Sequence, residues 1–323
     1  MNRRTSAWLG SLAVAALVGA GGAQAGSVPE SSEPIKLAIN EWTGQHLTTK
    51  IAGKILERMG YAVEYITAGY YPQLQGLADN DVTASLEIWM SNIGDGYGEA
   101  VGSGKVEELG DLGLVTRETW WYPAYVEEMC PGLPDWTALK ECTEIFATPD
   151  TMPSGRFVDY PADWGDLNAP RMKALGLDFV TIPAGSEGNI VAELKSAVEK
   201  KQPILTQLWS PHWVHAEIEM HQVKLPPYED ACVSDPAWGM NPDETFDCDW
   251  PEGRPVFKIA WAGMKDTWPA AYKFLKAFQL TTEEQLPMLY AVDSQGHTVD
   301  EIADEWVENN KDKWQAWVDA AMM

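Results

Sequence analysis

Residues 35–60, IKLAINEWTGQHLTTKIAGKILERMG, decide the fold class of this chain. Apolar residues alternate over 35–39, and further along they recur every four positions from Leu47 to Met59. A period of two predicts a strand, and the later spacing predicts a helix that Gly60 ends. The segment therefore predicts a strand, a turn and a helix.

The residues that follow extend this order. Residues 62–67 predict a second strand, 72–78 a short helix and 82–89 a third strand, which completes a β-α-β-α-β unit. Such alternation is typical of α/β proteins with parallel strands. A similar unit is predicted from about Trp120, with a helix-like piece at 137–146, a helix at 169–175, a strand at 179–182, a helix at 189–200 and a strand at 204–209.

The length of the chain predicts two lobes. Its 323 residues exceed the size at which a single hydrophobic core keeps growing. We assign residues 33–116 and 230–323 to lobe 1 and residues 117–229 to lobe 2. The C-terminal part of lobe 1 predicts helices, because Thr281 with Glu284 and Thr298 with Glu301 have the spacing of capping boxes.

The N-terminal residues have the pattern of a secretion signal. Arg3 and Arg4 precede an apolar run over 7–20 and the sequence Ala23-Gln24-Ala25. The run is shorter than the roughly twenty apolar residues that a membrane helix needs, and small residues flanking Gln24 favour cleavage. We predict a signal peptide over 1–25 and a mature protein in the periplasm.

The chain is strongly acidic. It has 48 Asp and Glu against 23 Lys and Arg, a formal net charge of −25. This charge disfavours binding to nucleic acid and to anionic membrane surfaces. The sequence contains no GxSxG, no HExxH and no Gly-rich phosphate loop, so it predicts neither an enzyme nor a cofactor.

Four cysteines indicate disulfides. In an exported protein, bridges are favoured over free thiols. Among the three possible pairings, Cys130–Cys142 with Cys232–Cys248 closes the shortest loops. A metal site is the competing interpretation, although no CxxC or HxH spacing supports it. The second bridge would staple residues 223–253, a stretch rich in Pro and Asp that predicts a long connection.

Sixteen tryptophans are the most informative feature of the composition. Trp42, Trp89 and Trp209 each follow or end a predicted strand, and ligands of open α/β sheets bind beyond the carboxyl ends of strands. Trp164 lies in a loop before the helix at 169–175, whose N-terminal N–H groups suit an anion. Aromatic faces attract a desolvated cation by ~2 kcal/mol or more. The pattern predicts a cleft for a ligand with a trimethylammonium head and a carboxylate tail.

Other tryptophans predict packing instead. Three of them recur at helical spacing near the C-terminus, where an apolar stripe against the lobe explains them: Trp306, Trp314 and Trp317.

Several stretches resemble the substrate-binding proteins of glycine betaine, proline betaine and choline ABC importers. The similarity runs over nearly all of the chain after the predicted signal peptide, and Trp-Ser-Pro-His-Trp at 209–213 is its most distinctive part. The other stretches are IKLAI at 35–39, RMGY at 58–61, ASLEIWM at 84–90, PADWGD at 161–166, PILTQLW at 203–209 and KWQAWV at 313–318.

The resemblance implies a two-lobe periplasmic-binding-protein fold of type II, whose lobes close over the ligand about a two-strand hinge. It implies as partners a small quaternary amine and an ABC permease in the inner membrane, and we expect a monomer. By position it implies the following ligand-binding residues: Trp89, Trp164 and Trp209 as an aromatic box, Gly165 and Asp166 as amide donors to a carboxylate, and His212 as a helper.

The identity of the ligand stays open at this point. Glycine betaine or proline betaine is the first choice, with choline or carnitine as the alternative. A carboxylate in the cleft, from Glu41, Asp163 or Asp166, would favour choline, which is a net cation. A function of a different class is zinc capture, for which one cluster provides ligands: His212, His215, Glu217, Glu219 and His221.

Overall fold

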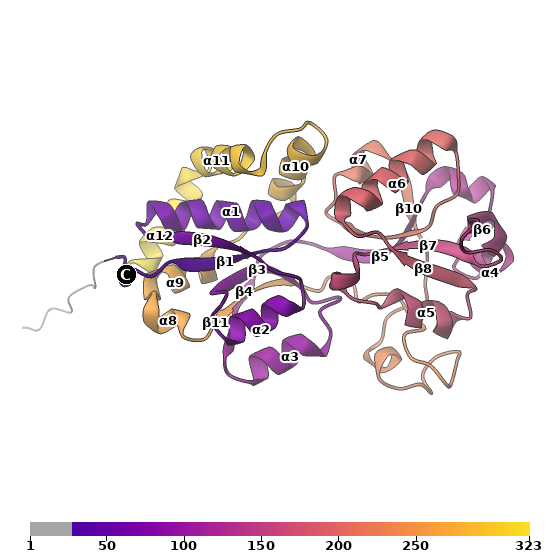
Figure 1. The fold of residues 1–323 in the computed structure, drawn as a ribbon, viewed down its shortest axis with the longest axis horizontal. Helices are drawn as coiled ribbons and strands as arrows, with labels where there is room; N and C mark the ends of the chain where they lie inside the picture. Colours follow the sequence, from indigo (N-terminus) through magenta and orange to yellow (C-terminus); the bar gives the residue numbers. More distant parts are fainter. Residues whose placement is uncertain (1–27) are drawn as a thin grey trace, which may run out of the picture.

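The computed structural model describes residues 28–323, and the predicted signal peptide over 1–25 lies outside them. The described residues form two five-stranded sheets that lie side by side along the long axis of the molecule, each with helices on both faces (Figure 1). We call the elements around the first sheet the first lobe and those around the second sheet the second lobe. None of the helices in residues 28–323 has the length and apolar character to span a membrane.

The first lobe combines both ends of the described chain. Its sheet has the strand order β2-β1-β3-β11-β4. The strands are β1 Ile35–Ile39, β2 Val63–Thr67, β3 Ala84–Trp89, β4 Val106–Asp111 and β11 Val256–Trp261. The helices are α1 Thr43–Arg58, α2 Pro72–Ala78, α3 Asp95–Gly102, α8 Met264–Thr267, α9 Pro269–Ala277, α10 Thr282–Asp293, α11 Val299–Asn309 and α12 Lys311–Ala321.

The second lobe is built from the middle of the chain. Its sheet has the strand order β10-β5-β9-β7-β8. The strands are β5 Arg117–Pro123, β7 Gly155–Asp159, β8 Phe179–Pro183, β9 Thr206–Ser210 and β10 Met220–Gln222, with a short β6 Pro131–Pro134. The helices are α4 Ala138–Glu141, α5 Asn168–Leu175, α6 Glu187–Lys200 and α7 Val214–Glu217.

The predicted two-lobe α/β fold is confirmed, and β1 pairs in parallel with β2 and β3 as expected. The sequence predicted a parallel α/β architecture, and the structure adds antiparallel strands, so that both sheets are mixed. Strand β11 runs antiparallel to β3 and β4, and β5 runs antiparallel to β9 and β10. Strand β11 begins where the chain returns from the second lobe, so it enters the first sheet at the end where β3 finishes.

Two chain segments cross between the lobes, one from β4 to β5 and one leading into β11. They contact each other, since Thr116 Oγ1 donates to the Arg254 carbonyl at 3.1 Å and the Leu112 N–H donates to the Val256 carbonyl at 2.8 Å. Two adjacent crossing segments give the geometry of a hinge. The division of the chain at 33–116, 117–229 and 230–323 stays a prediction.

Both predicted disulfides are present, Cys130–Cys142 and Cys232–Cys248. The second bridge lies in the long connection before β11. The same connection is anchored by the buried Arg171, whose Nε donates to the Cys248 carbonyl at 2.6 Å and whose guanidinium lies 3.4 Å from the centre of the Trp250 ring.

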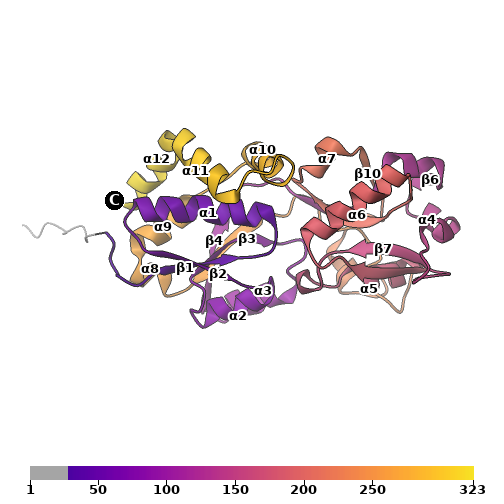
Figure 2. The same ribbon diagram turned by 45° about the horizontal axis from the view of Figure 1, so that its top comes forward.

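The C-terminal helices cover the first lobe, as predicted. Figure 2 shows α11 beside α1, and α12 packs against α9. Thr281 and Thr298 form the two capping boxes at the starts of α10 and α11. The three tryptophans interpreted as packing residues belong to the core of this lobe or pack against it: Trp306, Trp314 and Trp317.

Candidate functional site

A cavity with about 280 Å³ of empty space lies where the two lobes meet. Six aromatic side chains, one amide and one carboxylic acid line it, and each lobe contributes half of them. The first lobe provides Trp42, Tyr70, Trp89 and Asn92, and the second provides Glu118, Tyr160, Trp164 and Trp209. The lining side chains of the two lobes enclose little free space, so this cavity suits a ligand of few heavy atoms. We call its six aromatic side chains the aromatic cage.

Strand ends bring the cage together. Trp42 stands between β1 and α1, Trp89 ends β3, Tyr160 follows β7, and Trp209 is the penultimate residue of β9. The carboxyl ends of these four strands therefore face the junction, which is where open α/β sheets bind ligands. Tyr70 likewise comes after the carboxyl end of a strand, here β2.

The rings of the cage pack edge to face around Trp164. Their centres lie 5.2 Å from the Trp164 ring for Trp42, 5.3 Å for Tyr160 and 5.6 Å for Trp209, with interplanar angles of 64–73°. The contact between Trp42 and Trp164 joins the two lobes. Aromatic faces carry the negative part of the ring quadrupole, so a cage of this kind favours a compact cation over an anion.

The turn that presents Trp164 requires glycine after it. Residues 162–164 form a single 3-10 turn, and Gly165 follows with a φ of 113°. A Cβ at this position would lie 2.8 Å from the hydroxyl of Tyr71, which belongs to the first lobe. That hydroxyl donates to the Asn92 carbonyl at 2.8 Å. Only glycine meets both the backbone angle and the close approach between the lobes.

Glu118 is the one ionisable acid among the residues that line the cavity, and it is only 3 % exposed. Its Oε1 accepts hydrogen bonds from Tyr160 Oη at 2.9 Å and Asn92 Nδ2 at 3.0 Å, and its Oε2 accepts one from Ser91. Burial raises the pKa of Glu118 to about 7, against the lowering effect of these three hydrogen bonds. The cavity therefore contains a group that changes charge near neutral pH.

The structure gathers four of the predicted site residues in the cavity: Trp42, Trp89, Trp164 and Trp209. It places the other three elsewhere. Gly165 borders a small adjoining cavity, and the Asp166 side chain is exposed. His212 is buried behind Trp209, with 4.7 Å between the ring centres. The part that each of these seven residues plays in binding stays a prediction.

Four lining residues were missed from the sequence: Tyr70, Asn92, Glu118 and Tyr160. Tyr70 and Tyr160 follow strand ends, as the predicted tryptophans do, but the strand before Tyr160 was not recognised. Glu118 gave no usable signal, because an acid inside a strand is normally interpreted as solvent-exposed. The acids considered for the cleft, Glu41, Asp163 and Asp166, do not line the cavity.

The side chains considered for zinc are not gathered. Among residues 28–323, no group of three or more His, Cys, Asp or Glu side chains is arranged to hold a metal ion. Each histidine of that cluster faces a partner of its own: Glu187 Oε1 at 3.1 Å for His212, the Trp209 carbonyl at 3.0 Å for His215 and Glu127 Oε1 at 2.7 Å for His221.

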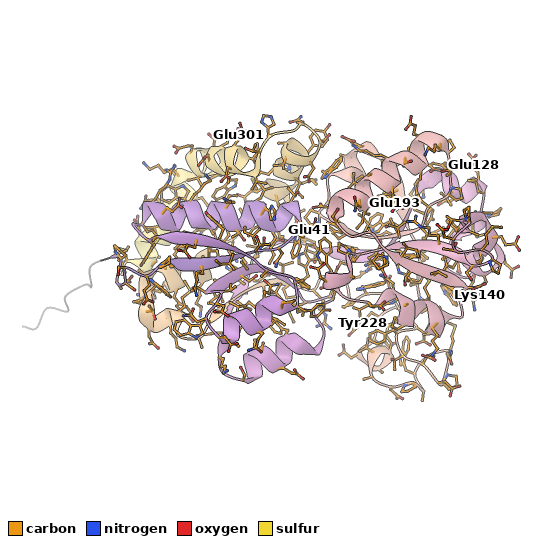
Figure 3. All side chains as sticks on the ribbon, viewed as in Figure 1. Glu41, Glu128, Lys140, Glu193, Tyr228 and Glu301 are labelled. Atoms are coloured by element: carbon orange, nitrogen blue, oxygen red, sulfur yellow. A yellow bond between two sulfur atoms is a disulfide. The ribbon has the colours of Figure 1, made fainter. Side chains whose placement is uncertain are left out.

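Acidic side chains also join the lobes beside the cage. Glu187, the first residue of α6, accepts the Thr43 N–H at the start of α1 at 2.9 Å. In return, Glu41 accepts the Glu187 N–H at 3.3 Å, and Figure 3 shows Glu41 where the lobes meet. Each helix N-terminus thus faces a carboxylate of the opposite lobe, which suits the positive end of a helix dipole.

The charges at this junction repel one another. Burial raises the pKa of Glu41, and the nearby charges of Glu187 and Asp163 raise it further. Burial also raises the pKa of Asp293 to about 6, with Glu187 adding to the effect. Asp293 accepts the Thr43 hydroxyl at 2.7 Å. The junction thus combines hydrogen bonds between the lobes with repulsion among like charges.

The sequence of residues 33–309 matches the family described as the substrate binding domain of ABC-type glycine betaine transport systems. The chain belongs to this family. Its members are binding components of a transport system and are not enzymes. The predicted similarity is confirmed over most of the chain.

Known proteins agree with this assignment. A trimethylamine N-oxide-binding protein of Pelagibacter ubique is 32 % identical over 294 residues, which cover 88 % of this chain and 90 % of the relative. Solved structures share the fold. A glycine betaine/L-proline-binding protein of Borrelia burgdorferi has a TM-score of 0.70 at 20 % identity over 90 % of this chain and 100 % of its own. A choline-binding protein in complex with choline has a TM-score of 0.69 at 19 % identity, over 91 % and 100 %.

Proposed function

We propose that this protein captures trimethylamine N-oxide in the aromatic cage and delivers it, as a periplasmic monomer, to the permease of an ABC importer. Six aromatic rings around a small cavity fit a trimethylammonium head. The relative of 32 % identity supports the choice of ligand, since it is a trimethylamine N-oxide-binding protein.

The observation that carries the proposal is the carboxyl group of Glu118 in the cavity. Its pKa of about 7 keeps a large share of it protonated at neutral pH. A protonated carboxyl donates a hydrogen bond to the oxide oxygen, a strong acceptor bonded directly to the ammonium nitrogen. Glycine betaine instead brings a carboxylate, which an ionised Glu118 repels in a site of low dielectric.

Glycine betaine is the second candidate, favoured by the description of the family. In this case the protonated Glu118 would donate to the ligand carboxylate. Choline is the third, because an ionised Glu118 attracts its net positive charge. Choline therefore differs from the other two ligands in how its affinity responds to pH.

Calorimetric titration with the three ligands at pH 6, 7 and 8 tests the proposal. We expect trimethylamine N-oxide to bind most tightly at pH 6 and to weaken as Glu118 ionises above pH 7. Choline should strengthen over the same interval. Glu118→Gln keeps a donor without a charge and should remove most of both pH dependences.

One control uses tert-butanol, which resembles trimethylamine N-oxide in shape but has no charge on its central atom. It should bind far more weakly, because a cation contact with aromatic faces contributes ~2 kcal/mol or more in a dry site. If glycine betaine binds more tightly than trimethylamine N-oxide at every pH, the choice of ligand is wrong.

A further inference from the structure

A second buried carboxylate, Glu87, lies behind the cage and outside the cavity lining. It belongs to β3 and is fully buried. At this point the register between β3 and β11 shifts, so that Leu86 and Glu87 together oppose the single residue Lys258. Bulges of this type bend a strand and redirect side chains near binding sites. Here the redirected carboxylate contacts two helices.

Three buried donors converge on Glu87. Trp42 Nε1 donates to Oε2 at 2.8 Å, while Thr48 Oγ1 and Gln285 Nε2 donate to Oε1 at 2.6 Å and 2.8 Å. Thr48 belongs to α1 and Gln285 to α10. Within residues 28–323 no Lys, Arg or His lies within 4.0 Å of this carboxylate as an ion-pair partner. Burial raises the pKa of Glu87, and the hydrogen bonds of Thr48, Trp42 and Gln285, with a smaller contribution from Trp89, oppose that rise.

The bond to Trp42 stands apart from the other two, because Trp42 lines the cavity and Thr48 and Gln285 do not. An indole ring has one donor, and a hydrogen bond from it, together with the covalent link to Cβ, restrains the orientation of the ring. Glu87 accepts the hydrogen bond of the Trp42 indole at 2.8 Å.

We propose that Glu87 is a positioning residue of the ligand site, which holds the Trp42 indole in the plane that completes the cage across the lobe junction. The role rests on the proposed function, since it takes effect through the affinity for a trimethylammonium compound. Trp42 is also the cage residue of the first lobe whose ring meets Trp164 of the second, at 5.2 Å. A ring that turns away loses both the ligand face and this contact.

The test compares Glu87→Met with Thr48→Val in calorimetric titrations with trimethylamine N-oxide. Glu87→Met removes the acceptor of the indole N–H at similar volume. Thr48→Val removes a hydrogen bond to the other oxygen of the same carboxylate and leaves the indole bond in place. We expect affinity to fall about tenfold in Glu87→Met, the effect of one lost buried hydrogen bond. Thr48→Val should lower the melting temperature and stay within about twofold of the wild-type affinity.

A double-mutant cycle isolates the indole bond. In a Trp42→Phe background there is no ring N–H, so Glu87→Met should change the affinity by less than about twofold. A tenfold loss that persists in this background would overturn the positioning role, and so would wild-type affinity in folded Glu87→Met.

A measurement without ligand covers the case in which Glu87→Met does not fold. The indole N–H resonance of Trp42 in ¹⁵N-tryptophan-labelled protein, assigned with Trp42→Phe, reports the bond directly. In Glu87→Gln, a chemical shift of the Trp42 indole N–H that differs from wild type should accompany a loss of affinity. A wild-type chemical shift should accompany wild-type affinity. Any other combination contradicts the proposal. If the wild-type protein binds none of the three ligands, the proposed function is wrong. The Trp42 indole resonance would still test the hydrogen bond between Trp42 and Glu87.

Discussion

Glu118 is a carboxyl group whose ionisation is opposed by the fold. Its pKa is about 7 in the folded protein, against a usual value near 4.3 in an unfolded chain. Between about pH 4.3 and pH 7 the folded state binds more protons at Glu118 than the unfolded state does. The contribution of Glu118 to the free energy of unfolding therefore falls as pH rises through this range, and above about pH 7 it falls no further.

A first prediction follows for the ligand-free protein. The melting temperature of Glu118→Gln relative to wild type should rise from pH 4.5 to pH 7 and stay level above pH 7, because only the wild type loses stability in that window. Scanning calorimetry across this range measures the difference between the two proteins, which removes the titration of other buried acids such as Asp159. A difference that does not vary with pH would contradict the assignment.

A second prediction concerns the cage itself. Trp209→Ala should weaken the binding of trimethylamine N-oxide by ~2 kcal/mol, roughly thirtyfold, because it removes one aromatic face. Trp209→Phe should lose less. Trp306 provides the control, since it is a buried residue of the first lobe that is remote from the cavity lining. Trp306→Ala should lower the melting temperature while the folded fraction keeps its affinity; intact affinity in folded Trp209→Ala would refute the cage.

At the scale of elements, two helices meet end to end at the junction. Helices α1 and α6 begin there, and each N-terminus faces a carboxylate of the other lobe, Glu41 or Glu187. Such contacts exist only while the lobes touch. They therefore stabilise the closed arrangement and contribute nothing to an open one.

The third prediction tests this contribution. Glu187→Ala leaves the Thr43 N–H without its acceptor in the closed form, which costs about 1–3 kcal/mol. We expect a roughly tenfold weaker affinity, expressed mainly as faster dissociation in stopped-flow tryptophan fluorescence. Glu193→Ala on the same helix is the matched control, because Glu193 pairs with Arg156 inside the second lobe. Equal effects of the two substitutions would exclude a role for the junction.

The sequence predicted elements better than it predicted the mixed sheets. Helix α1 was visible from its apolar spacing, and the short α2 was predicted with its observed bounds, Pro72–Ala78. Strand β11 was not, because VFKIAW contains Lys258, a lysine that the fold buries completely and satisfies with the Phe278 and Lys276 carbonyls. Such compensation depends on tertiary contacts that no local pattern contains.

Half of the residues that line the cavity could be predicted from the sequence. Tryptophans at strand ends can be found from sequence, because the rule for α/β sheets gives their location. Glu118 could not be found, since its burial depends on Ser91 and Asn92 of the other lobe. The second-lobe loop with Gly165 and Asp166 was expected to offer backbone N–H groups to an anion, and this expectation stays a prediction.

At the scale of the whole molecule, the cavity has no complete wall within either lobe. Four lining residues come from each side, and two crossing segments link the sides. A ligand that contacts both lobes binds the closed form better and shifts the population toward it.

The fourth prediction is that saturating trimethylamine N-oxide reduces the radius of gyration in small-angle scattering, because the ligand-free protein samples open forms about the hinge. Glu187→Ala should be more extended without ligand than wild type. An identical scattering curve with and without ligand in both proteins would argue for a rigid molecule.

The contact between Trp42 and Trp164 gives the protein an optical signal of its own state. The two indoles belong to different lobes and lie 5.2 Å apart at 73°. At this distance their electronic transitions couple and produce an exciton couplet in circular dichroism. Separation of the lobes would remove the contribution of this pair, while the pair Trp164–Trp209 within the second lobe, at 5.6 Å, would keep its own. The difference between the spectra of the two states therefore reports opening without any added dye.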